Sequence, residues 1–176
     1  MSSRFEPTGG ETAYEGKIAT VRVETFRHED GEEITREIVR HNGAVAVVAH
    51  DGERIYLVRQ PREAVGVPDL LELPAGKLDE EGETPLQTAE RELAEEIGKA
   101  AEQWEHLVTF YTSPGFTDEE VHVYLATGLS DASAETDEHE RIDVVTHALS
   151  ELDALIDEAR DSKTLIGLLE LRRRGA

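Results

Sequence analysis

LPAGKLDEEGETPLQTAERELAEEIG, residues 73–98, is the stretch that determines how the middle of this chain folds. Thr84 is a favourable helix N-cap, Pro85 suits the first helical position, and Gln87 completes a Thr-x-x-Gln capping box. Gly98 is of the type that commonly ends a helix. The segment therefore predicts one helix between these two caps. Its apolar residues at helical spacing predict a buried stripe formed by Leu86, Ala89, Leu93 and Ile97.

Three carboxylates lie close together on this predicted helix, because Glu92 is three residues from Glu95 and four from Glu96. Like charges at this spacing destabilise a helix, and the C-terminal half of a helix disfavours anions. A divalent cation would remove both penalties, because Mg²⁺ takes oxygen ligands. On the glutamates alone, however, a solvated acidic helix face is the better interpretation.

The residues around the glutamates change that interpretation. Gly76 is followed by six residues and Glu83, and then by seven residues and RELAEEIG (91–98). The spacing of these residues resembles the signature of the Nudix hydrolases. The first spacer is one residue longer than in the family pattern, and Lys99 stands at a position that is apolar there. The extra residue falls in a loop, where insertion costs little, and Lys99 lies beyond the helix. Neither departure touches the carboxylates.

The resemblance implies an enzyme that uses Mg²⁺ or Mn²⁺ to hydrolyse a nucleoside diphosphate linked to another group. It also implies an α+β fold, the α/β/α sandwich in which helices flank a mixed sheet. Arg91 would orient the glutamates through an ion pair, and Glu83 would support the preceding loop. The implied metal ligands are Glu92, Glu96, Glu95 and a backbone carbonyl of Ala75 or Gly76.

Other features resemble the ADP-ribose pyrophosphatase branch of the family. Residues 70–76, LLELPAG, match the entry to the motif in that branch, and the resemblance runs from about residue 16 to residue 174. Pro114 lies fifteen residues past Lys99, a position associated with ADP-sugar hydrolysis. Dimers of this branch exchange an N-terminal subdomain. The resemblance thus implies a homodimer that acts on ADP-ribose or a related ADP-sugar.

Several polar side chains suit such a substrate. Arg59 and Arg62 are expected to hold its phosphates, because a guanidinium donates two parallel hydrogen bonds to a phosphate. Glu72 is expected to accept hydrogen bonds from ribose hydroxyls or adenine. Gly76 and Pro114 complete the expected substrate contacts around the motif.

An acidic loop near residues 137–142 resembles the loop that supplies a late carboxylate in this branch. Glu140 is the better match for a catalytic or metal-binding role, and Glu138 is the next candidate, with a substrate contact. Glu140 or a glutamate of the motif would take the proton of the attacking water. The products from ADP-ribose would be AMP and ribose 5-phosphate.

The composition restricts the remaining possibilities. The 176 residues include 39 Asp and Glu, 18 Lys and Arg and no cysteine, which gives a formal net charge of −21. Such a charge disfavours nucleic acids and anionic membranes as partners, and the lack of cysteine excludes disulfides and thiol chemistry. The apolar runs are short for a bilayer span, so we expect a cytoplasmic protein. The acid excess with few lysines resembles the proteins of salt-loving organisms.

Hydrophobic periodicity divides the chain into two expected regions. Residues 1–42 are expected to form a loosely held arm (1–12) and a β-hairpin (17–40), and the family resemblance implies that this region is exchanged in the dimer. Residues 43–176 are expected to form the Nudix domain. Its expected strands are 44–49, 54–59, 70–74, 105–111, 120–127 and 142–146, and its expected helices are 85–97, 149–159 and 163–174.

Two alternatives stay open at this point. The chain could hydrolyse another nucleotide, such as a dinucleoside polyphosphate, NADH or a damaged nucleoside triphosphate. It could also be a sensor that binds ADP-ribose without cleaving it. The complete set of Arg91 and the three glutamates disfavours the sensor.

Overall fold

A computed structural model describes residues 4–133 and 141–175. The chain divides into two compact units, and each of them contains segments that are distant in sequence. The first unit consists of Met1–Gly43 and Tyr111–Glu120, and the second of Ala44–Phe110 and Val121–Ala176.

The first unit contains a three-stranded antiparallel sheet of β1 (Phe5–Glu15), β2 (Thr20–His28) and β3 (Glu33–Arg40). The expected hairpin is present as β2 and β3. The expectation of a loose arm is wrong for residues 5–12, which belong to β1. Every residue of β1 is exposed, so its apolar pattern is weak, and the backbone pairing with β2 holds it in place.

Residues 111–120 join this sheet through backbone and side-chain hydrogen bonds. The N–H of Val39 donates to the carbonyl of Phe116 at 2.8 Å, and the N–H of His41 donates to Oδ1 of Asp118 at 2.9 Å. Arg40 also donates to Oδ2 of Asp118 at 2.9 Å. The segment between β8 and β9 is therefore fastened to the end of β3.

The second unit is built on a seven-stranded sheet in the order β10-β5-β4-β9-β8, with β6 added to β5 and β7 added to β4. The sheet is mixed, because β4 is antiparallel to β5 and parallel to β9. Its strands are β4 (Ala44–His50), β5 (Arg54–Arg62), β6 (Val67–Glu72), β7 (Ala75–Lys77), β8 (Lys99–Tyr111), β9 (Glu120–Asp131) and β10 (Asp143–Ala148).

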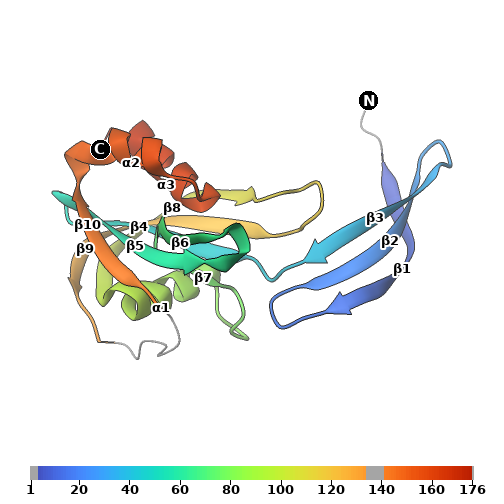
Figure 1. The fold of residues 1–176 in the computed structure, drawn as a ribbon, viewed down its shortest axis with the longest axis horizontal. Helices are drawn as coiled ribbons and strands as arrows, with labels where there is room; N and C mark the ends of the chain where they lie inside the picture. The colour runs from blue at the N-terminus through green and yellow to red at the C-terminus, as the bar shows by residue number, and fades with distance from the viewer. Residues whose placement is uncertain (1–3, 134–140, 176) are drawn as a thin grey trace. The chain divides into compact units, whose positions relative to one another are not determined.

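Helices cover both faces of this sheet. The helices are α1 (Pro85–Ile97), α2 (Leu152–Glu158) and α3 (Ser162–Arg173), and Glu63–Val65 and Leu149–Glu151 form short 3₁₀ turns. Figure 1 shows α1 on one face and α2 with α3 on the other. Within the described residues, none of the helices is long and apolar enough to cross a membrane.

Strand β4 supplies side chains to two separate cores, one on each face. Val45 and Val47 pack with the α1 residues Ala89, Leu93 and Ile97. The alternate β4 residues belong to the other core, with leucines of α2 and α3: Ala46, Val48, Leu152, Leu155, Leu168 and Leu171. Because successive strand residues face opposite sides, this arrangement makes the three-layer sandwich that the motif predicted.

Helix α1 begins and ends where the sequence predicted. Thr84 accepts a hydrogen bond from the Gln87 N–H, and the Gln87 side chain accepts one from the Thr84 N–H, which completes the capping box. Gly98 adopts the left-handed conformation with φ 64° and donates to the carbonyl of Ala94. The local chemistry of both ends thus fixes the length of the helix.

Candidate active site

The loop before α1 is fastened to the centre of the sheet. Ala75 and Gly76 of β7 pair with Ala46 and Val45 of β4. The N–H of Val47 donates to the carbonyl of Pro74 at 2.8 Å. This backbone pairing holds the loop beside the C-terminal half of α1.

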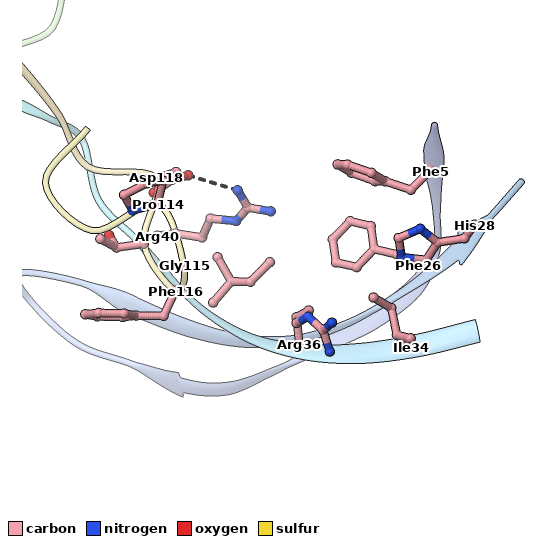
Figure 2. Close-up of a pocket in the computed structure, with 12 residues that line it drawn as sticks. Phe5, Phe26, His28, Ile34, Arg36, Arg40, Pro114, Gly115, Phe116 and Asp118 are labelled. Atoms are coloured by element: carbon pink, nitrogen blue, oxygen red, sulfur yellow. Dashed lines mark hydrogen bonds and ion pairs between the residues drawn. The ribbon is translucent and has the colours of Figure 1, made fainter. Parts of the chain in front are cut away.

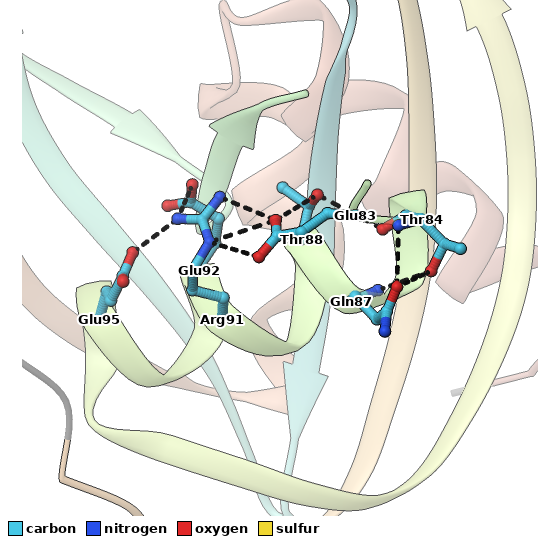
Figure 3. A network of polar contacts seen from close by, with 7 residues as sticks. All are labelled: Glu83, Thr84, Gln87, Thr88, Arg91, Glu92 and Glu95. Atoms are coloured by element: carbon cyan, nitrogen blue, oxygen red, sulfur yellow. Dashed lines mark hydrogen bonds and ion pairs between the residues drawn. The ribbon is translucent and has the colours of Figure 1, made fainter. Parts of the chain in front are cut away.

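Arg91 gathers the carboxylates of α1 and of the loop, as Figure 3 shows. Its Nη1 donates to Oε1 of Glu92 at 2.9 Å and to Oε2 of Glu95 at 2.8 Å. Its Nε lies 3.2 Å from Oε1 of Glu83, whose other oxygen accepts from the Thr88 hydroxyl at 3.0 Å. One guanidinium thus holds three acidic side chains.

The charges in this cluster stabilise one another. Burial disfavours the charged form of Arg91, but hydrogen bonds and charges from Glu83, Glu92 and Glu95 raise its pKa above the ordinary value. The hydrogen bond from Arg91 in turn lowers the pKa of Glu83. Arg91 and Glu83 therefore both favour their charged forms.

Two glutamates of α1 approach the loop closely. The Glu96 Oε2 atom accepts a hydrogen bond from the Ala75 N–H at 2.9 Å. A Cβ atom at Gly76 would overlap the carboxylate of Glu92, so only glycine leaves room for this approach. Within residues 4–133 and 141–175, no three acidic or histidine side chains are arranged to hold an ion. Glu92 and Glu95 pair with Arg91.

Beside the start of α3, Glu72 lies at the centre of a second polar network. Its carboxylate is 1% exposed and accepts from Arg62 Nε at 2.6 Å, Arg62 Nη2 at 2.8 Å and Lys163 Nζ at 2.6 Å. Lys163 also pairs with Asp161 at 2.9 Å. Burial would raise the pKa of Glu72, but the hydrogen bonds and charges of Arg62 and Lys163 lower it below the ordinary value.

The same turn of α3 reaches the loop backbone. Asp161 caps α3 by accepting from the Thr164 N–H at 2.9 Å and the Thr164 hydroxyl at 2.7 Å. The Thr164 oxygen accepts from the buried N–H of Leu73 at 2.9 Å. The start of α3 therefore positions both Glu72 and the residue that follows it.

The predicted substrate residues are distributed over different places. Arg62 and Glu72 contact each other directly, whereas Arg59 pairs with Glu158 at 2.5 Å and lies 3.5 Å from Asp69. Pro114 belongs to the first unit, where it lines a pocket with aromatic side chains and Arg40 (Figure 2). Glu138 and Glu140 lie outside the described residues.

Sequence reasoning missed four residues of these networks: Thr88, Asp161, Lys163 and Thr164. An aspartate three residues before a threonine is an N-cap signal, so Asp161 could have been found. Lys163 had no such signal, because a lysine near a helix start is usually solvated.

The fold and the carboxylates held by Arg91 define the class of protein. The chain matches the model of the NUDIX domain over residues 39–167, and it belongs to the Nudix family, as the motif predicted.

Known proteins extend this assignment. The chain is 44% identical over 167 residues to a methanol dehydrogenase activator of Bacillus methanolicus, covering 92% of this chain and 89% of the relative. It is 41% identical over 182 aligned positions to an ADP-ribose pyrophosphatase of Bacillus subtilis, covering 100% of this chain and 97% of the relative. Its fold matches the crystal structure of an ADP compounds hydrolase with a TM-score of 0.87 and 22% sequence identity. The match covers 97% of this chain and 94% of the hydrolase chain.

Proposed function

We propose that this protein hydrolyses the diphosphate linkage of ADP-ribose or a related ADP-sugar and releases AMP and a sugar phosphate. The main support is the similarity over the full chain to an ADP-ribose pyrophosphatase, together with an intact set of motif carboxylates. Arg91, Glu92, Glu95 and Glu96 are all present, which disfavours a sensor that binds without cleaving.

The types of donor atom in the motif suit a divalent cation. The carboxylates of Glu92, Glu95 and Glu96 and the carbonyl of Ala75 are oxygen donors of the kind that Mg²⁺ and Mn²⁺ take. The close approach of Glu92 to Gly76 and of Glu96 to Ala75 supports their assignment as ligands beside the loop. A bound cation would supply charge neutralisation for the diphosphate and a more acidic attacking water.

The reaction is an in-line displacement at phosphorus. A water oxygen forms a new bond to one phosphorus while the bond from that phosphorus to the bridging oxygen breaks, and the bridging oxygen leaves with the other phosphate. The water proton passes to a carboxylate. We assign this role to Glu140, with Glu138 as a further substrate contact, on the resemblance of the acidic loop alone. Glu140→Gln should abolish most turnover, whereas unchanged activity would transfer the role to a glutamate of the motif.

Arg62 is the better candidate for a phosphate-binding residue in this function. Its side chain is 41% exposed, while the 25% exposed side chain of Arg59 is engaged by Glu158. Glu72 is buried and bonded to two cations, so any contact with ribose or adenine would require one of them to move. We retain Pro114 and Gly76 as substrate contacts in the proposal.

A substrate panel tests the function directly. The protein is incubated in molar KCl with Mg²⁺ or Mn²⁺ and with ADP-ribose, other ADP-sugars, a dinucleoside polyphosphate, NADH or an oxidised nucleoside triphosphate, and the products are identified. AMP with ribose 5-phosphate supports the proposal. Preferred turnover of another nucleotide contradicts the substrate, and binding of ADP-ribose without turnover contradicts the activity.

We further propose that the protein is a cytoplasmic homodimer in which residues 1–42 are exchanged and residues 43–176 form the Nudix domain. Support comes from large apolar side chains that are exposed on the first unit, with Phe5 62%, Tyr14 64% and Ile18 68% exposed. Light scattering coupled to size exclusion measures the mass. A monomer at micromolar concentration would contradict the dimer.

A second candidate function follows from the methanol dehydrogenase activator that is 44% identical to this chain. The protein could activate an alcohol dehydrogenase. Adding it to a methanol dehydrogenase assay, with and without Mg²⁺, tests this function separately from nucleotide hydrolysis.

A further inference from the structure

The buried carboxylate of Glu72 requires a physical explanation. Four charged side chains from β5, β6 and the start of α3 form what we call the Glu72 cluster: Arg62, Glu72, Asp161 and Lys163. Removing a carboxylate from water costs several kcal/mol, and an ion pair often does no more than offset that cost. The cluster is therefore poorly explained as a source of stability, and orientation of its members is the alternative.

The hydrogen bonds of Arg62 indicate what is oriented. A guanidinium has five N–H donors, and Glu72 takes one from Nε and one from Nη2. Within the described residues, Nη1 makes no hydrogen bond. The edge formed by Nη1 and Nη2 therefore keeps three donors, and the side chain is 41% exposed. Such an edge fits two oxygens of one phosphate.

Lys163 determines the charge that Arg62 presents. Without Lys163, Arg62 would face the buried carboxylate of Glu72 together with the negative charges of Asp161 and Glu96. Lys163 Nζ lies 2.6 Å from Glu72 Oε2, the same oxygen that accepts from Arg62 Nη2, and its side chain is 16% exposed. It therefore neutralises part of the Glu72 charge beside the guanidinium of Arg62. Asp161 is compensated in part by the positive end of the α3 dipole, because it caps that helix.

We propose that Lys163 is a positioning residue for substrate binding, which acts by holding and neutralising Glu72 so that Arg62 presents its Nη1–Nη2 edge to a substrate phosphate. The proposal rests on the proposed function, because it requires a substrate with a phosphate group. Lys163 itself does not touch the substrate. Its effect is on binding, because Arg62 would hold the phosphate equally in the ground state and the transition state.

The test uses the α,β-methylene analogue of ADP-ribose, which cannot be hydrolysed, in titration calorimetry with Mg²⁺ present. Lys163→Met removes the charge and keeps most of the length of the side chain. We expect it to weaken binding of the analogue about tenfold, which corresponds to the loss of one charge-assisted hydrogen bond between Arg62 and the phosphate. KM for ADP-ribose should rise by a similar factor while kcat changes little. Lys163→Arg, which retains a cation beside Glu72, should restore most of the affinity.

Two comparisons separate positioning from a general structural effect. In Glu72→Gln there is no carboxylate to neutralise, so adding Lys163→Met should cause no further loss of affinity. Lys99→Met is the matched control: Lys99 pairs with Asp131, which is 92% exposed, and its loss should leave binding unchanged. Circular dichroism and thermal melting establish that each variant is folded.

The outcomes are distinct. Binding of the analogue by Lys163→Met within about threefold of wild type, or an equal loss in the Glu72→Gln background, overturns the role of Lys163. If Lys163→Met does not fold, Lys163→Gln is judged against the same threefold limit. Turnover of ADP-ribose by the wild type decides the proposed function independently, and a wild type that binds no analogue overturns the role of Lys163 alone.

Discussion

Replacing Gly76 with alanine should separate activity from stability. The backbone φ of Gly76 is not positive, so alanine fits the local conformation without strain. The new Cβ atom would overlap Cδ and Oε1 of Glu92, which are at the far end of a flexible side chain. The fold can therefore relax by turning that side chain away. We expect the melting temperature to change by less than about 4 °C, because alanine also restricts the unfolded chain by about 0.4–1 kcal/mol.

Activity should respond differently, because the displaced carboxylate is an assigned metal ligand. We expect kcat/KM for ADP-ribose to fall at least about 100-fold, equivalent to about 2.7 kcal/mol of transition-state stabilisation. Binding of Mn²⁺, followed by the paramagnetic resonance of the free ion, should weaken about 10- to 100-fold. AMP release measured over a Mn²⁺ series gives both quantities.

Two other glycines provide matched controls. Gly9 has no atom within 4 Å of a built Cβ and no positive φ, so Gly9→Ala should retain activity and raise the melting temperature by no more than about 4 °C. Gly82 also has open space but φ +89°, so Gly82→Ala should lower stability by about 1 kcal/mol, or roughly 2–4 °C, and retain activity. Wild-type kcat/KM and Mn²⁺ affinity in Gly76→Ala would refute the requirement for close approach of Glu92.

Four further predictions address the rest of the molecule. Thr164→Val should lower the free energy of unfolding by about 1–3 kcal/mol, because it leaves the buried N–H of Leu73 without its acceptor. Thr164→Ser keeps the acceptor and should retain stability, and thermal melting of both variants distinguishes them. Glu96→Gln should lower kcat at least about 100-fold with an unchanged circular dichroism spectrum, and near-normal turnover would remove Glu96 from the metal site. Backbone hydrogen bonds from Arg54 and Glu53 lower the pKa of Asp51 from 3.8 to about 2. The pKa of Asp51 is lower in the folded than in the unfolded chain, so Asp51 stabilises the fold above pH 3.8 and this stabilisation is lost towards pH 2. Acid unfolding of Asp51→Asn should lack this loss of stability, and acid-unfolding curves identical to those of the wild type would contradict the prediction. Finally, the melting temperature should rise from low to molar KCl, because salt screens repulsion within a chain of net charge −21, and a constant value would exclude salt adaptation.

Local chemistry explains which parts of the fold could be predicted. The α1 helix was predicted to the residue, since its capping box and terminal glycine depend only on neighbours in sequence. Strand β1 was not predicted, because its pairing with β2 leaves all its side chains exposed and so produces no hydrophobic pattern.

The candidate site divides in the same way. The contact of Arg91 with Glu95 follows from helical spacing, and the motif suggested the ion pairs of Arg91 with the glutamates. The contact between Lys163 and Glu72 joins residues 91 positions apart, and only the packing of α3 against the sheet brings them together. Long-range pairs of this kind require the structure.

The path of the chain between the two units affects how the protein can be divided. Because residues 111–120 belong with the N-terminal sheet, the chain passes between the units at three points, after residues 43, 110 and 120. A deletion of residues 1–43 would remove Val39 and His41, the hydrogen-bond partners of Phe116 and Asp118, and would leave the ends of β8 and β9 joined by an unsupported segment. The N-terminal sheet is therefore not a detachable module. A shortened version suitable for crystallisation, or for fusion to another protein, would also need a new tight connection in place of residues 111–120.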